Sequence, residues 1–219
     1  MKKKPAINEL LAVMARLRSP KGCPWDREQT HHSLRFHAVE EVYELMDAIE
    51  ANDDHELAEE LGDLLLQVVF HCQLGSERGA FDFEKVARRI TEKLIRRHPH
   101  VFGDVKVKDV DEVWANWEKI KRAEKQGTRH ARASALDGIP RHLPALLRAE
   151  KLVKKARKAK LLAETKPTKL AKTKLARELF ALAEKAQRHG WSAEALLRGE
   201  VQRHERKLRA SERRTQRAS

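Results

Sequence analysis

The chain has 219 residues, enough for one large or two small domains, and it contains only nine glycines and seven prolines. Its many Ala, Leu, Glu, Lys and Arg residues favour helix over sheet, so we predict an all-α fold. No apolar run has the length of a membrane span, and the first residues lack a secretory pattern. Two cysteines are too few for a disulfide framework or a thiolate zinc site. We therefore expect a cytoplasmic protein without a membrane partner.

The formal net charge of +13 comes from the last third of the chain. Residues 1–150 carry 25 Lys and Arg against 26 Asp and Glu, whereas residues 151–219 carry 21 against 7. A segment this basic can contact nucleic acid through its phosphates, but a solvated basic helical face has the same composition. We favour the solvated face over a nucleic-acid partner.

The apolar periodicity of the first 75 residues predicts three helices. A stripe from Ile7 to Leu17 forms the first helix, which ends near Ser19-Pro20. The segment KGCPWDREQT is expected to be a loop, and a helix follows over about residues 32–50. One residue of the turn Asn52-Asp53-Asp54 should cap the next helix, over about residues 55–74.

Glycine, proline and aspartate mark the elements that follow. Gly75 and Gly79 indicate a turn, after which FDFEKVARRITEKLIRR predicts a fourth helix stopped by Pro99. DEVWANWEKIKRAEK predicts a fifth helix, opened by Asp109 or Asp111.

A polar stretch and the segment SALDGIPRHLP separate these helices from the basic third of the chain. We predict a first domain over residues 1–128, a connecting segment over residues 129–150 and a basic helical region over residues 151–219.

The second and third predicted helices are unusually acidic. Residues 40–71 hold eleven Asp and Glu, and residues 39–69 hold no Lys or Arg. Carboxylates that share a partly buried groove repel each other by several kcal/mol per close pair at an effective dielectric of about 20, so a cation must offset them. All-oxygen ligands favour Mg²⁺ or Mn²⁺ over zinc. A solvated acidic face paired with cations of other helices is an equally good interpretation of this composition.

Helical geometry brings four of these acids into register. Glu41 and Glu44 are i, i+3 neighbours on the first acidic helix, while Glu60 and Asp63 belong to a narrow polar stripe on the second. The rest of that second helix is apolar, so we expect it to be largely buried. A short connection makes the two helices an antiparallel hairpin, in which the two pairs can face each other.

These residues resemble the motifs of a known family. Glu40-Glu41-x-x-Glu44 followed by Glu60-x-x-Asp63 is similar to the EExxE and ExxD motifs of the MazG-type nucleoside triphosphate pyrophosphohydrolases. The resemblance extends over about residues 5–155, through KGCPWDREQTHHSL, FDFEKVARRITEKLIRRHPHVFGD, VWANWEKIKRAEK and SALDGIPRHLPALLRAEKL. It implies a MazG-like helical bundle whose antiparallel helices carry an acidic Mg²⁺ site. It also implies a homodimer or higher homo-oligomer that hydrolyses an NTP to an NMP and pyrophosphate.

The resemblance also implies roles for the acids. Glu41, Glu44, Glu60 and Asp63 would be the metal ligands, and a metal-bound water would attack the α-phosphate. Glu40 would orient or deprotonate that water.

Four further residues would bind the substrate. The chain has no GxxxxGK[ST] loop, and Lys93, Arg96 and Arg97 match the family's KxxRR segment, so we expect them to contact the triphosphate. Taken alone, such a cluster in a last helical turn more often compensates the helix dipole. His37 matches a family position near the nucleotide, although a lone helical histidine is commonly structural.

The basic third resembles a degenerate copy of the family's second half. In ARELFALAEKAQRHG, Glu178 stands where Glu60 does, but Ala181 replaces Asp63 and no EExxE motif is present. We therefore predict that the metal site lies in the first half. The alternative function is a catalytically silent nucleotide- or nucleic-acid-binding module that uses the basic third.

Overall fold

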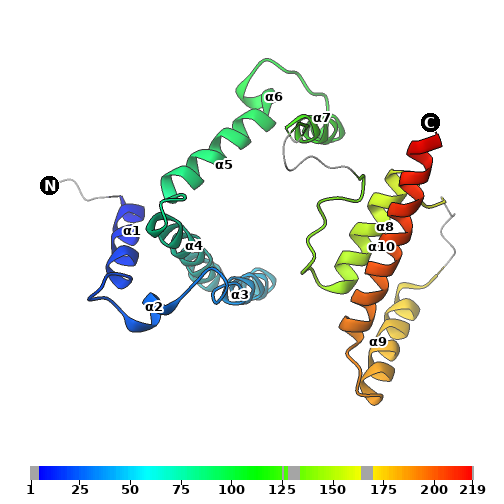
Figure 1. Ribbon diagram of the computed structural model, residues 1–219, viewed down its shortest axis with the longest axis horizontal. Helices are drawn as coiled ribbons and strands as arrows, with labels where there is room; N and C mark the ends of the chain where they lie inside the picture. The colour runs from blue at the N-terminus through cyan, green and yellow to red at the C-terminus, as the bar shows by residue number, and fades with distance from the viewer. Residues whose placement is uncertain (1–4, 125, 128–133, 164–169, 219) are drawn as a thin grey trace. The chain divides into compact units, whose positions relative to one another are not determined.

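The computed structural model describes residues 5–124, 126–127, 134–163 and 170–218. All regular elements in these ranges are α-helices, so the predicted all-α class is confirmed (Figure 1). The chain divides into two compact units, Met1–Trp117 and Glu118–Ser219. None of the described helices combines the length and apolar character needed to cross a bilayer. The domain boundaries predicted at residues 128 and 150 stay predictions.

The helices follow one another along both units. The first unit contains α1 (Ala6–Leu17), α2 (Pro24–Glu28), α3 (His37–Ala51), α4 (Asp54–Glu77), α5 (Phe83–Arg97), α6 (Pro99–Phe102) and the first part of α7 (Val110–Ala123). The second unit contains the end of α7, then α8 (Ala145–Lys158), α9 (Lys172–Arg188) and α10 (Ala193–Ala218).

The region before the acidic helices differs from the prediction in two ways. The expected loop KGCPWDREQT contains the short helix α2, because Pro24 at its first position has the fixed φ that a helix start requires. The helix predicted from about residue 32 begins only at His37, since turns occupy residues 31–36.

The turn predicted at Gly75 is also wrong. Gly75 lies inside α4, where an added Cβ would meet Cε2 of Phe81 at 2.6 Å and the Phe81 carbonyl oxygen at 2.7 Å. The glycine therefore permits a close approach of the chain that follows α4. The turn itself forms at Gly79, whose φ of +64° lies in the left-handed region.

The predicted capping residues fix the ends of the acidic helices. Asn52 ends α3 in the left-handed conformation, and Asp53 caps α4 by accepting the backbone N–H of His55 at 2.9 Å. Of the two candidates for α7, Asp109 is the cap, since it accepts the backbone N–H of Glu112 at 2.9 Å. The two-residue connection turns α3 back along α4, and these helices pack side by side (Figure 1).

The core of the first unit covers only part of α4. Helix α1 packs on the C-terminal half of α4, where the buried cluster consists of Met14, Leu34, Val69, Phe70 and Leu74. At 1.5 Å per residue, α1 is about 18 Å long and α4 about 36 Å, so α1 cannot cover the whole of it. Leu61 and Leu65 in the other half are 50% and 39% exposed. The expectation that this helix is largely buried is therefore wrong for the N-terminal half of α4 in the single chain.

The second unit is built on the pair α8 and α10. Its buried cluster consists of Leu136, Leu152, Ala156 and Val201, and α9 packs more lightly on α10. Phe180 and Leu182 on α9 are exposed.

Candidate metal centre

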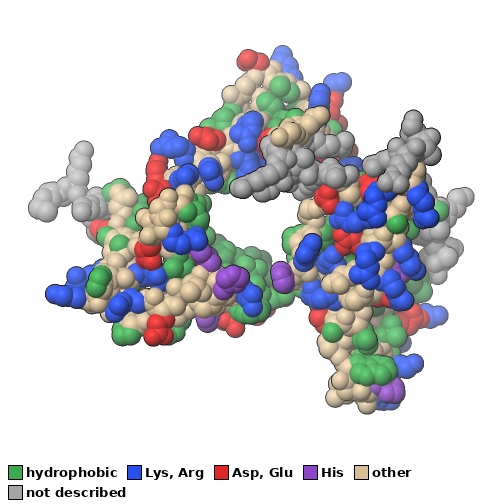
Figure 2. Space-filling model, in the orientation of Figure 1, with side chains coloured by type: hydrophobic (Ala, Val, Ile, Leu, Met, Phe, Trp, Pro, Cys, Tyr) green, Lys and Arg blue, Asp and Glu red, His purple; other side chains and the backbone are tan. Residues whose placement is uncertain are grey.

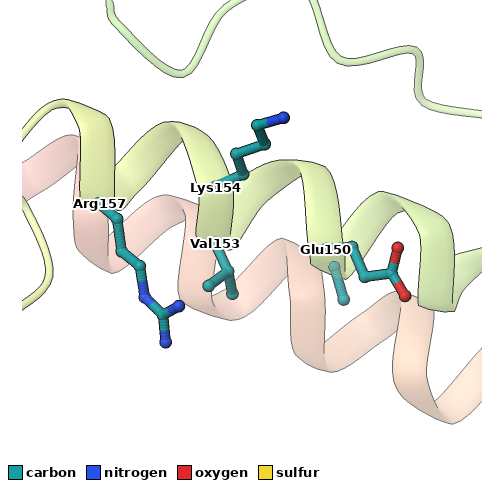
Figure 3. A pocket seen from close by; sticks show the side chains of 5 residues that line it. Glu150, Val153, Lys154 and Arg157 are labelled. Carbon is teal, nitrogen blue, oxygen red and sulfur yellow. The ribbon is translucent and has the colours of Figure 1, made fainter. Parts of the chain in front are cut away.

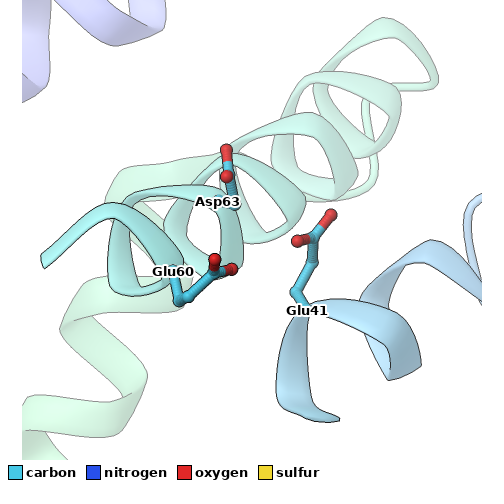
Figure 4. Close-up of side chains that lie close together, drawn as sticks. All are labelled: Glu41, Glu60 and Asp63. Carbon is cyan, nitrogen blue, oxygen red and sulfur yellow. The ribbon is translucent and has the colours of Figure 1, made fainter. Parts of the chain in front are cut away.

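Three carboxylates meet where α3 lies beside the N-terminal half of α4. Glu41 reaches across from α3 towards Glu60 and Asp63 of α4 (Figure 4). Each offers one oxygen, and these oxygens lie within 4.8 Å of one another. Oxygens on opposite sides of a bound Mg²⁺ are about 4.2 Å apart, twice the usual bond length of about 2.1 Å. Small side-chain rotations would therefore bring the three groups to the spacing that a divalent ion requires.

The electrostatics of the site disfavour its charged form. Partial burial raises the pKa of Glu41, and the charges of Asp63 and Glu44 raise it further, against the opposing effect of a hydrogen bond from Gln67. The pKa of Glu60 is raised by desolvation and then by Glu44, Asp63 and Glu41. Negative charge is thus concentrated at this site.

No basic side chain neutralises this cluster within the described part of the chain. The salt bridges there involve other acids, and none joins a Lys or Arg to Glu41, Glu60 or Asp63. Burial and neighbouring acids raise the pKa of Glu41 and of Glu60. A set of carboxylate oxygens that no described basic side chain neutralises fits a hard divalent cation, Mg²⁺ or Mn²⁺.

Gln67 was not among the predicted site residues, yet it holds one of the acids. Its Nε2 donates to Oε1 of Glu41 at 3.2 Å, and the Gln67 side chain is buried. It lies one turn after Asp63 in the polar stripe of α4, so the same i, i+4 spacing was visible in the sequence. Gln67 therefore orients Glu41 towards α4.

The other predicted acids of α3 lie beside this cluster. Glu44 is exposed, one turn after Glu41, and close enough for its charge to raise the pKa values of both Glu41 and Glu60. Glu40 is exposed and lies 3.2 Å (Oε2) from Nδ1 of His37. The structure thus brings three of the four predicted ligands together with the fourth nearby, and it pairs Glu40 with His37.

The predicted phosphate-binding residues lie on another element. Lys93, Arg96 and Arg97 occupy the last turns of α5, and the guanidinium of Arg97 stacks over the ring of Trp117 at 5.3 Å. Helix α5 contacts α4 and then runs away from the α3–α4 hairpin (Figure 1). Within the single chain, these cations are not gathered with the carboxylates.

The polar stripe of α4 ends in a pair of histidines. Nδ1 of His71 lies 2.7 Å from Nδ1 of His31, and Nη2 of Arg78 lies 2.8 Å from Nε2 of His31. Since Arg78 can only donate, His31 accepts at Nε2 and donates from Nδ1 to His71. Burial lowers the pKa of both imidazoles, and Arg78 lowers that of His31 further. With both histidines neutral, these contacts join the segment that precedes α3 to α4.

Comparison with known proteins places these helices in a family. Residues 29–102 match the MazG nucleotide pyrophosphohydrolase domain. The nucleoside triphosphate pyrophosphohydrolase of Escherichia coli (strain K12) is 51% identical over 150 residues, which are 68% of this chain and 56% of that protein. An uncharacterized 26.1 kDa protein of Streptomyces cacaoi is 40% identical over 206 residues, 93% of this chain and 81% of that protein.

A solved structure gives a weaker match. The crystal structure of a MazG-related protein from Thermotoga maritima aligns with 52% of this chain and 97% of its own, at a TM-score of 0.45 and 26% identity.

The chain spans about half the length of the E. coli relative. The matched domain includes α3, α4 and all three carboxylates of the candidate metal centre. Residues 29–102 of this chain therefore belong to the MazG family of nucleotide pyrophosphohydrolase domains.

Proposed function

We propose that this protein hydrolyses nucleoside triphosphates to nucleoside monophosphates and pyrophosphate, with Mg²⁺ or Mn²⁺ as cofactor. The observation that carries the proposal is the group of Glu41, Glu60 and Asp63, which no described Lys or Arg neutralises, within the segment that matches the MazG domain. The activity named for the E. coli relative supports it.

The carboxylates would hold the cofactor. Glu41, Glu60 and Asp63 would be ligands, and Glu44 would complete the set, since its charge already acts on the same site. A bound divalent ion would neutralise negative charge that develops on the phosphates. Gln67 would keep the Glu41 carboxylate turned towards α4 while the site is loaded.

The reaction needs a proton acceptor for the attacking water. Water would attack the α-phosphorus, the bond from that phosphorus to the oxygen bridging the α- and β-phosphates would break, and pyrophosphate would leave with that oxygen. We assign the orientation or deprotonation of this water to Glu40, on the basis of the family resemblance. His37, 3.2 Å from Glu40, would stabilise the acid in the required orientation.

Binding of the triphosphate needs positive charge as well. Lys93, Arg96 and Arg97 keep this role as a proposal, with His37 near the nucleotide. Because α5 runs away from the hairpin, their contact with the triphosphate would involve a second copy of the chain or a different position of α5.

The exposed apolar face of the hairpin supports an assembly of this kind. Val39, Val42, Met46 and Ile49 on α3 are between 42% and 54% exposed, and Leu61 of α4 is 50% exposed. A contiguous apolar helix face of this kind typically packs against a partner. We propose that a homodimer or higher homo-oligomer buries it.

The compartment follows from the substrate class. We propose a cytoplasmic location, where NTPs are abundant, and the two free cysteines are consistent with a reducing environment.

The alternative function is a catalytically silent binding module that uses the basic third. It predicts NTP or nucleic-acid binding without turnover.

One assay separates the two functions. The purified chain is incubated with each common NTP in Mg²⁺, in Mn²⁺ and in EDTA, and pyrophosphate release is measured. We expect turnover only with metal, and a loss of about 100-fold or more in Glu41→Gln and Asp63→Asn. Glu50→Gln, which removes one acid from the opposite side of α3, is the matched control and should retain activity.

Three results would contradict the proposal. They are an absence of turnover in metal, the primary release of orthophosphate and NDP, and near-normal activity in both ligand variants.

A further inference from the structure

The second unit contains a polar hollow that the proposed reaction does not use. It has a volume of about 590 Å³ and lies between the segment 137–141, α8 and α10. Its charged lining consists of Arg141, Arg148, Arg206, Arg209, Asp137 and Glu205. Figure 2 shows Lys and Arg side chains gathered over the α8 and α10 face of this unit. The charged lining of the hollow is thus richer in basic than in acidic side chains.

Arg148 is the central observation. Its side chain is 6% exposed, and its Nη2 donates to Oε2 of Glu205 at 2.5 Å. Its Nε and Nη1 are buried and have no hydrogen-bond partner among the residues that the structure describes. Buried guanidinium N–H groups are rarely left unpaired, because they lose their hydration without replacement. These two nitrogens are therefore available to an acceptor that is not among the described residues.

The acids of the lining are already engaged by a second arginine. Arg209 donates from Nε and Nη2 to Oε1 of Glu205 at 3.0 and 2.7 Å, and from Nη1 to Oδ1 of Asp137 at 2.7 Å. Four guanidinium groups therefore face two carboxylates. The lining keeps a formal excess of two positive charges, and Arg141 and Arg206 carry it at the exposed rim.

The shape and chemistry of the lining define the ligand. Guanidinium groups match the oxygens of phosphate, and several of them around one hollow suit an anion with more than one charge. Among the lining residues that the structure describes, no aromatic side chain offers a stacking surface for a base. The volume exceeds the needs of a single phosphate group.

We propose that this hollow is a binding site for a small phosphate-type oxyanion of about the size of pyrophosphate. Arg148 supplies buried donors at its wall, and Arg141 and Arg206 close on the anion from the rim. The site lies outside the carboxylate cluster of α3 and α4, and it does not depend on whether the chain hydrolyses NTPs.

Calorimetric titration of the full chain with sodium pyrophosphate tests the site. EDTA is present throughout, so that the carboxylate cluster holds no metal, and 150 mM KCl screens non-specific attraction. We expect saturable binding of one pyrophosphate per chain and weaker binding of orthophosphate. Arg141→Gln/Arg206→Gln should weaken pyrophosphate binding by about tenfold or more, because two charged donors are lost.

A matched double variant provides the control. Lys154→Gln/Arg157→Gln removes two charges from the shallow depression that Glu150, Val153, Lys154 and Arg157 line on α8 (Figure 3). Arg157 lies nine residues from Arg148 and thus on the opposite side of the helix. This control should bind pyrophosphate within about twofold of the wild type.

Four results would overturn the proposal. One is the absence of saturable binding to the wild type. Another is an equal loss of affinity in both double variants, which would mean general electrostatic attraction. A loss in Lys93→Gln/Arg96→Gln with full retention in Arg141→Gln/Arg206→Gln would assign the binding to α5. Binding of a single-stranded oligonucleotide without binding of pyrophosphate would assign the basic surface to nucleic acid.

Discussion

Neutralising Glu41 should stabilise the metal-free protein. The raised pKa of Glu41 means that the folded state holds its proton more tightly than the unfolded state does. This contribution to stability is complete at low pH and is lost as the pH rises through the folded pKa. At neutral pH the ionised Glu41 therefore destabilises the fold, and Glu41→Gln should remove that cost while its amide oxygen still accepts from Gln67.

The distance between the carboxylate oxygens sets the size of this destabilisation. Two unit charges 4.8 Å apart, the upper limit for oxygens of Glu41 and Asp63, repel by about 0.9 kcal/mol in water and by about 3.5 kcal/mol at an effective dielectric of 20. Because Glu41 is only half-buried, we expect a gain near the lower value, about 1 kcal/mol. This corresponds to a rise in Tm of about 2–4 °C for a chain of this size.

Mg²⁺ should reverse the order of thermal stability of the wild type and Glu41→Gln. A ligand present at 100 times its Kd stabilises the folded state by about 2.7 kcal/mol, which exceeds the repulsion that the mutation relieves. The wild type should gain this stabilisation free energy in Mg²⁺. Glu41→Gln should gain much less, because one of its metal ligands is weakened.

The assay is thermal unfolding of both proteins at pH 7.5, in EDTA and in saturating Mg²⁺, beside Glu50→Gln. The control removes one acid of α3 outside the cluster, so its response to Mg²⁺ should match the wild type. Equal Mg²⁺ stabilisation of all three proteins would refute the metal centre, and a lower Tm of Glu41→Gln in EDTA would refute the repulsion argument.

Three further outcomes are expected. Turnover in ¹⁸O-labelled water should place the label in the NMP, with unlabelled pyrophosphate; label in pyrophosphate would contradict attack at the α-phosphorus. The pKa values of His31 and His71 are lowered from 6.5, so the unfolded chain binds protons at a higher pH than the folded chain does. Tm should therefore fall as the pH drops below about 6.5. His71→Gln should reduce this dependence of Tm on pH, and an unchanged dependence would contradict the pairing of the two histidines. Gly75→Ala should destabilise by about 1–3 kcal/mol through contact with Phe81, whereas Gly199→Ala, in open space on α10, should be neutral or stabilising; equal unfolding curves for the two variants would count against the close approach.

Local signals predicted most helix ends correctly. The caps Asp53 and Asp109 were among the candidates because an aspartate before an amphipathic run satisfies the free N–H groups of the first turn. Gly75 was misjudged because glycine has two uses, a turn and a close approach, and only the position of Phe81 decides between them. That contact is a tertiary property, which periodicity does not contain.

The candidate site was predictable to the extent that one hairpin builds it. Glu41, Glu60 and Asp63 meet because their helical positions and a short connection fix their register. The position of Lys93 depends instead on the direction of α5, which neither its own sequence pattern nor that of α4 encodes. The buried guanidinium of Arg148 was also hidden, since a basic helix with a solvated face has the same composition as one that lines a hollow.

The α3–α4 hairpin carries an acidic cluster and an exposed apolar face on the same two helices. The carboxylates of this cluster pair with no Lys or Arg among the described residues, and apolar residues such as Val42, Met46 and Leu61 are exposed in the single chain. A second chain packed on those residues would exclude water near the carboxylates, and a lower local dielectric would strengthen their attraction for a divalent ion. The ion would in turn relieve the repulsion that opposes close packing. Because such coupling is reciprocal, metal binding and assembly should each strengthen the other. This coupling offers a physical reason to place so many acids on helices that also carry an apolar face.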